Sequence, residues 1–446
     1  MISSLRAATP QSGVSSNPNY IFLLDEIKLL VPGLIEKTGI AKRFKPRLYN
    51  YVDFILPVLY TLSTTLSLEQ ACEELNNLFT ERVEQTYGVK PKVFSDGVRK
   101  RRFIPHQTKV DQFLRRFTEK EVQFVFGNLI TTINERIRRL EINSSKVKFI
   151  ADNTKYPYYG NCRTDTEIKH PKLPGTKVCR MFQGHSVYGC KLHLFTQFNI
   201  IRKDIYRAKE IPASVSWLKF SGYKISYSLV DREFYRVTLI RELRKLLIPV
   251  IMPSKKYPKV IHEMVNFIRF KRKLVDIYLF TQNNNQYPKQ KSINVYLPLI
   301  GHNNQTAEEI REKYYSTKLK MDEIVKEMAG FFTTLAPWKN VRAYIRFLVR
   351  TYKQRWNIET AFRCLNSTHY SFRNRESVKS LAQIYMKALI YNNWQFWRKH
   401  MLKECKSYSA GTQQLFLKRL SDVIVEYYED ILYERVRKVL KQNKEV

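Results

Sequence analysis

The fold is decided by the stretch YKISYSLVDREFYRVTLIRELRKLLIPVIMP (223–253). Its first nine residues, which end at Asp231, are rich in β-branched and aromatic side chains and predict a strand. Residues 232–247 follow with a helical pattern, and the short apolar run 248–253 predicts another strand. A strand, a helix and a second strand in this order indicate a βαβ unit in a mixed sheet.

Two stretches upstream predict strands for the same reason, VKFIADNTKYPYYG (147–160) and HSVYGCKLHLFTQFNII (185–201). Asp152 follows the apolar run VKFI, so we expect it at the end of its strand, as Asp231 is at the end of another. Carboxylates at the open edge of an α/β sheet lie where ligands and metals collect. Taken alone, either aspartate is more often explained by a turn or a helix N-cap, and Asp231 in particular by a cap of the helix that follows it.

The segment YKQRWNIETAFRCLN (352–366) has the pattern of an amphipathic helix. At about 100° per residue, an apolar stripe adjoins a polar row. The polar row consists of Tyr352, Arg355, Glu359, Arg363 and Asn366. Taken alone, the row is also explained as a salt-bridged surface with Arg355 and Glu359 four residues apart.

Tyr352, Arg355 and Glu359 stand at the spacing Y-x2-R-x3-E, and with this spacing the chain resembles prokaryotic insertion-sequence transposases of the DDE class. The sequence contexts of Asp152 and Asp231 resemble the same family, over roughly residues 146–392. The resemblance implies an RNase H-like catalytic core in which these five residues share one site.

In such a site Asp152, Asp231 and Glu359 would be the catalytic triad and the metal ligands. The resemblance implies two Mg²⁺ ions, for which Mn²⁺ would substitute, with Asp152 bridging both ions and the other two acids each holding one. Water would cleave at the end of the element, and the freed 3′-OH would attack target DNA. Tyr352 and Arg355 would hold the DNA phosphate near the cut.

Two positions depart from the family pattern. Glu233 stands where the family has Gly. Asn366 stands where it has a Lys that contacts the terminal phosphate, so a neutral hydrogen bond replaces a charge. Arg363, on the same face, is the candidate substitute; alternatively, the chain is a weakened enzyme.

The charge of the chain points to a polyanionic partner. Lys and Arg number 77 against 40 Asp and Glu, a net charge of +37. An anionic membrane is the alternative partner to nucleic acid. The apolar stretch 48–68, however, contains Asp53 and Pro57 and does not have the pattern of a membrane-spanning helix. The N-terminus also has no apolar signal core. We therefore expect a cytoplasmic, nucleoid-associated protein with no membrane partner.

The expected partner is double-stranded DNA, as inverted repeats at transposon ends and as target DNA, with self-association as a homodimer or larger assembly on DNA implied by the resemblance. A basic run in the linker is expected to contact the DNA backbone. This run comprises Arg99, Lys100, Arg101 and Arg102.

The six cysteines form no CxxC pair, so neither a disulfide framework nor a zinc site is indicated. Structural roles are expected for His185 and His193. Packing is favoured for Trp356, Trp394 and Trp397, with contact to DNA as the alternative.

The predicted architecture is α+β, an RNase H-like mixed-sheet catalytic core with a β-rich insertion, flanked by N- and C-terminal helical regions. From Asp231 to Glu359 the gap is 359 − 231 = 128 residues, too long for a minimal core, and a hairpin is predicted inside it at 275–301. In the N-terminal part, helix starts are predicted at Ser67 before Gln70 and near Thr118. The expected parts are a flexible arm (1–18), a helical DNA-binding region (19–145), the catalytic core (146–254 and 340–395), the β-rich insertion (255–339) and a C-terminal helical region (396–446).

Two other functions fit the same residues. One is a non-catalytic basic DNA-binding protein, a degenerate transposase. The other is an RNase H-like nuclease of another pathway. Metal-dependent nicking at inverted-repeat ends is expected of an active transposase and of neither alternative.

Overall fold

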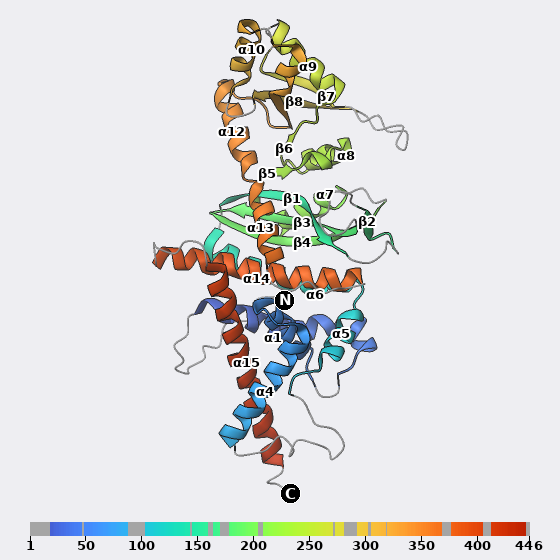
Figure 1. Cartoon of the computed structure of the whole chain (residues 1–446), viewed down its shortest axis with the longest axis vertical. Coiled ribbons are helices and arrows are strands. Elements are labelled where there is room, and N and C mark those ends of the chain that lie inside the picture. Colours follow the sequence, from blue (N-terminus) through green and yellow to red (C-terminus); the bar gives the residue numbers. More distant parts are fainter. Residues whose placement is uncertain are drawn as a thin grey trace.

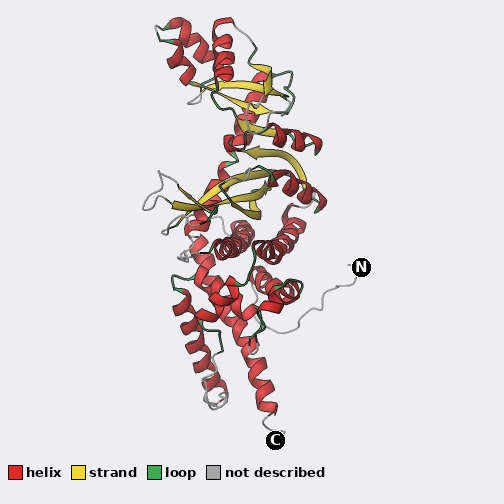
Figure 2. Cartoon of the chain, turned by 90° about the vertical axis from the view of Figure 1, so that its right-hand side faces the viewer, coloured by secondary structure: helices red, strands yellow, loops and turns green. Residues whose placement is uncertain are grey.

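The computed structural model shows an elongated molecule with a mixed sheet between two helix-containing parts (Figures 1 and 2). The structure describes residues 18–46, 49–87, 103–142, 145–158, 164–169, 178–203, 208–270, 273–280, 292–301, 305–317, 319–367, 376–404 and 412–442.

The sheet has nine strands in the order β2-β3-β1-β5-β6-β9-β8-β7, with β4 paired to β3. Its first six strands are β1 (Lys146–Pro157), β2 (Glu167–Lys169), β3 (Val178–Gly189), β4 (Leu192–Ile201), β5 (Lys224–Val230) and β6 (Val250–Pro253). β1 is antiparallel to β3 and parallel to β5, and β5 is parallel to β6. Helix α8 (Val237–Lys245) joins β5 to β6, so the predicted βαβ unit and mixed sheet are confirmed.

The prediction of one strand over 185–201 is wrong, because a tight turn divides it into part of β3 and all of β4. Cys190 and Lys191 form this turn with φ angles of 51° and 63°. Both central residues of such a two-residue turn need positive φ, which Asn and Gly supply most easily. Since neither residue is of that kind, the sequence carries no signal for the turn.

The free edge of β4 is covered by a helix through side-chain hydrogen bonds. Asn392, on α14 (Ser377–Glu404), accepts from the Phe195 amide at 2.9 Å and donates to its carbonyl oxygen at 2.8 Å. Tyr385 bonds the Phe198 amide and carbonyl in the same way, each at 3.1 Å. Unpaired strand edges need such partners.

The N-terminal part is helical. It comprises α1 (Pro18–Glu36), α2 (Ile40–Arg43), α3 (Val52–Ser63), α4 (Leu68–Tyr87), α5 (Gln107–Arg115), α6 (Glu119–Ile137) and the π-helical turn η2 (Arg138–Ile142). The two predicted helix starts are confirmed by reciprocal caps, Ser67 with Gln70 and Thr118 with Glu121. No helix in the described residues is long and apolar enough to cross a membrane.

Between β6 and α12, further strands extend the same sheet. The elements here are α9 (Pro258–Phe270), β7 (Val275–Phe280), β8 (Ile293–Gly301), α10 (Ala307–Ser316), α11 (Met321–Lys326) and β9 (Met328–Thr333). β7 and β8 form the predicted antiparallel hairpin, and β9 joins β8 to β6. Three helices accompany the strands, and together they form the upper part of Figure 1.

The C-terminal helices are α12 (Val341–Lys353), α13 (Trp356–Ser367), α14 and α15 (Thr412–Gln442). A single helix over 352–366 was predicted, and this is wrong, because the chain turns at Gln354 and Arg355. Tight three-residue hydrogen bonds mark the turn, with Arg355 N donating to Tyr352 O at 2.9 Å and Ile358 N to Arg355 O at 3.0 Å. The turn separates α12 from α13 four residues before Glu359.

Candidate active site

The register of two parallel strands places the aspartates side by side. β1 and β5 are paired up to Ala151 and Val230, so Asp152 and Asp231 occupy the next position of each chain segment. Neighbouring strands lie about 4.8 Å apart. Asp231 ends its strand as predicted. Asp152 does not, because β1 continues to Pro157 along β3, with Gly184 opposite Asp152.

Glu359, in the first turn of α13, is joined to Asp152 through Arg355. Nη1 of Arg355 donates to Oδ2 of Asp152 at 2.7 Å, and Nη2 donates to Oε1 of Glu359. The side chains of Arg355 and Asp152 are only 9% and 13% exposed, against 31% for Glu359. One buried guanidinium therefore ties an acid of the sheet to an acid of the helix, although the acids are 359 − 152 = 207 residues apart in the sequence.

The pKa of Asp152 is affected by burial and by the neighbouring charges. Burial raises the pKa of Asp152 to about 6. Arg355 acts in the opposite direction, while the negative charges of Asp231 and Glu359 raise the pKa further. Asp231 and Glu359 therefore both lie close enough to Asp152 to affect its charge.

A glycine sets the distance between α13 and the sheet. A Cβ atom on Gly184 would lie 2.7 Å from Cζ of Phe362 and 3.2 Å from Phe198. Phe362 lies one turn after Glu359 on α13 and is buried against the sheet. Only a residue without a side chain at 184, directly opposite Asp152, admits this ring. Gly184 could not be predicted from the sequence, since nothing in its local pattern distinguishes it from other strand residues.

Tyr352 supports the guanidinium from the other side of the turn. The ring centroid of Tyr352 lies 5.5 Å from Cζ of Arg355 and 5.3 Å from the ring of Phe331 on β9. Burial raises the pKa of Tyr352, so the phenol is neutral at physiological pH. The polar row Tyr352–Arg355–Glu359 is thus a local cluster although two helices contribute to it.

The segment after β5 is fixed by two further contacts. Oδ1 of Asp231 accepts from the Arg232 amide at 2.7 Å and caps the 3₁₀ turn η3 (Arg232–Phe234). Nδ2 of Asn153 donates to Oε2 of Glu233 at 2.9 Å. Asp231 therefore has the capping role that its sequence position allowed, and its other carboxylate oxygen is not needed for the cap.

The remaining predicted DNA contacts are exposed or lie outside the described residues. Arg363 is exposed on α13, four residues after Glu359. Asn366 lies on α13, but its side chain is outside the described part, as is the whole of the basic run 99–102. Trp356 is 56% exposed, so the prediction that it packs is wrong. It stands in the first turn of α13, facing away from the buried Ile358.

The other residues singled out by the sequence have structural roles. His185 and His193 are buried, and burial lowers the pKa of each to about 3. His185 shares a hydrogen bond with the hydroxyl of Ser214, with Nδ1 and Oγ 2.7 Å apart. His193 shares one with the hydroxyl of Ser186, with Nε2 and Oγ 2.9 Å apart. Trp394 and Trp397 are buried as predicted, and the described cysteines are free thiols.

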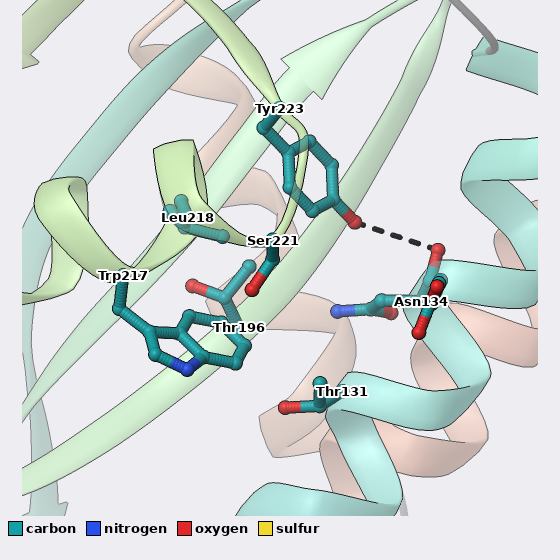
Figure 3. Close-up of a pocket in the computed structure, with 8 residues that line it drawn as sticks. Thr131, Asn134, Thr196, Trp217, Leu218, Ser221 and Tyr223 are labelled. Carbon is teal, nitrogen blue, oxygen red and sulfur yellow. Dashed lines mark hydrogen bonds between the residues drawn. The ribbon is translucent and has the colours of Figure 1, made fainter. Parts of the chain in front are cut away.

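A small pocket opens between α6, β4 and α7 (Glu210–Phe220), away from the acidic cluster (Figure 3). Tyr223 closes one side by donating to the Asn134 carbonyl oxygen at 3.4 Å. None of the predicted site residues lines this pocket. The acidic cluster is therefore the stronger candidate for catalysis.

Three carboxylates are the ligands that a hard divalent cation prefers. Within the described residues, however, no three acidic, His or Cys side chains stand close enough to hold an ion. Arg355 explains this, because its guanidinium lies between Asp152 and Glu359 and neutralises them. The donor set fits a divalent metal in kind, and a bound metal would compete with Arg355.

One family model matches the part of the chain that contains this site. The family model for the transposase DDE domain matches residues 144–393, more than half of the chain. Among solved structures, the chain is similar to piggyBac transposase in a synaptic complex with hairpin DNA, at 10% identity and a TM-score of 0.43, over 95% of this chain and 82% of that one. No curated protein matches. The chain therefore belongs to the transposase DDE domain family.

Proposed function

We propose that this DDE transposase cleaves DNA at the ends of its element and joins the freed 3′-OH to target DNA by phosphoryl transfer. One observation carries the proposal. Arg355 bonds Asp152 and Glu359 beside Asp231, so acids from two strands and a helix converge on one buried cation. Buried acids with a raised pKa are typical of functional sites.

Enzymes of this family use divalent metal ions. In the proposed site Asp152, Asp231 and Glu359 hold Mg²⁺, and Mn²⁺ substitutes for it. When bound, the ions activate the attacking oxygen and stabilise the leaving oxygen at phosphorus. Asp152 is the central ligand, because it alone neighbours both Asp231, through the strand register, and Glu359, through Arg355.

Arg355 has two alternative sets of partners in this proposal. Without DNA its guanidinium neutralises Asp152 and Glu359. A DNA phosphate offers the same bidentate geometry as a carboxylate. Transfer of Arg355 to the phosphate next to the cut releases both acids for the metal and holds the substrate, with Tyr352 packed against the guanidinium.

The other DNA contacts remain proposals on sequence grounds. Arg363 supplies a charge near the terminal phosphate in place of the family Lys, for which this chain has Asn366. The N-terminal helices and the run 99–102 contact the DNA ends, and two copies of the chain act on two ends. Asn366 is also the observation that favours the second candidate, a degenerate transposase that binds DNA without cutting it.

The test uses a plasmid that carries the coding region with its native flanking DNA. Wild-type protein with Mg²⁺ or Mn²⁺ is expected to nick at both flanks and to transfer strands to a second DNA. Asp152→Asn and Glu359→Gln are expected to abolish both steps and to retain DNA binding. Nicking by either variant at the wild-type rate would refute the residue assignment. DNA binding without nicking by the wild type would favour the degenerate transposase.

A further inference from the structure

Helix α12 carries a row of cations that no acid neutralises. Arg346, Arg350 and Lys353 are exposed on it. In the part of the chain that the structure describes, none of the three forms an ion pair or a side-chain hydrogen bond. The sequence of α12, VRAYIRFLVRTYK, contains no acidic residue. An ordinary solvated helix face would mix both signs of charge.

The three cations share one face of α12. Tyr344, Leu348 and Thr351 bury the opposite face. At about 100° per residue, the cations fall within a sector of about 60°. Like charges four residues apart destabilise a helix. The helix dipole favours cations in the last turn, which accounts for Arg350 and Lys353 but not for Arg346.

The row leads directly to the candidate active site. α12 runs from the β7–β8–β9 part of the molecule to the turn at which α13 begins (Figure 1). Lys353 is its last residue, two positions before Arg355. From Arg346 to Lys353 the helix rises by about 10 Å. This length equals about three phosphate-to-phosphate steps of one DNA strand, at about 3.4 Å of axial rise each.

We infer that Arg346, Arg350 and Lys353, the α12 stripe, bind consecutive phosphates of the DNA strand that enters the acidic site. The stripe positions duplex DNA by charge and carries no base specificity. This inference rests on the proposed function only for the identity of the strand. Binding of duplex DNA by the stripe stands whether or not the acids are catalytic.

The test measures the affinity of the full chain for a 30-bp duplex of arbitrary sequence, by fluorescence anisotropy in EDTA at several KCl concentrations. A plot of log K against log[KCl] has a negative slope, and each lost phosphate contact makes this slope shallower by about 0.9. R346A/R350A is therefore expected to make the slope shallower by about 2 and to weaken binding more at low salt than at high salt.

The matched control is K418A/R419A on α15, which removes the same charge from two other exposed residues. It is expected to leave the slope unchanged. Equal slopes for the two variants would show an effect of net charge alone and overturn the inference. R346Q/R350Q, which keeps side-chain length, serves if the alanine variant unfolds.

A second measurement excludes a membrane as the partner. Binding to vesicles of phosphatidylserine and phosphatidylcholine is compared for wild type and R346A/R350A. A loss of vesicle binding with an unchanged DNA slope would assign the stripe to an anionic lipid surface and overturn the inference. Because no step uses cleavage, inactivity of the enzyme leaves the result interpretable.

Discussion

Replacing Arg355 by Gln should destabilise the metal-free protein and make it more responsive to divalent ions. The substitution removes the cation that bonds Asp152 at 2.7 Å and leaves that acid buried beside Asp231 and Glu359. Breaking a buried ion pair on one side costs about 3 kcal/mol. The exposed pair of Arg342 and Glu308 is the matched control, for which Arg342→Gln should cost less than about 1 kcal/mol.

The assay is urea unfolding at pH 7.5 followed by circular dichroism, first in EDTA and then with MnCl₂. An ion that binds only the folded chain stabilises it by about 2.7 kcal/mol at a hundredfold excess over its dissociation constant. Since no guanidinium competes for Asp152 in the variant, Mn²⁺ should stabilise Arg355→Gln more than the wild type. Equal midpoints in EDTA, or equal stabilisation of both proteins by Mn²⁺, would refute the role of Arg355.

Three further predictions concern residues that support the site. Gly184→Ala should lower the rate of strand transfer on the order of 10- to 100-fold, because the added methyl group displaces α13. Adding Phe362→Leu should restore part of the rate. An unchanged rate in the Gly184→Ala single variant would contradict this role of Gly184. His185 and His193 have pKa values lowered from 6.5 to about 3, so the folded chain is fully stable above pH 6.5 and loses stability as the pH falls. At pH 5 each histidine should reduce the unfolding free energy by about 2 kcal/mol relative to its value at high pH. Replacing both by Gln should remove the difference between the urea midpoints measured at pH 7 and at pH 5. Asn392→Leu should cost about 2 kcal/mol in urea unfolding, because the Phe195 amide loses its partner; a smaller effect than that of an exposed-site control would contradict the edge-covering role.

The βαβ unit and the helix starts were predictable because they depend on residues close together in the sequence. The βαβ unit around Asp231 followed from the change of hydrophobic period, and Ser67 and Thr118 marked helix starts because their caps involve residues only three positions away. The turn at Cys190 and Lys191 was not predictable, since the strand pairing imposes positive φ on residues that do not favour it. Tertiary pairing overrides local preference there.

The three acids were predicted from two strand ends and from the resemblance to a family, but the residues around them were not predicted. Arg355 was predicted to hold DNA, and its contact with Asp152 depends on the turn that separates α12 from α13. No helical period in 352–366 indicates that turn. Gly184 matters only because α13 approaches β3 opposite Asp152, a contact between segments far apart in the sequence. Such contacts become visible only once the chain is folded.

Iron-mediated cleavage of the polypeptide tests the shared metal site most directly. Fe²⁺ with ascorbate and peroxide, bound in place of Mg²⁺ in the protein–DNA complex, cuts the backbone next to its ligands. The three-acid site predicts cuts near residues 152, 231 and 359 together, all suppressed by excess Mg²⁺ and all lost in Asp152→Asn. Cuts near only one of these positions, or a pattern that Asp152→Asn leaves intact, would contradict it.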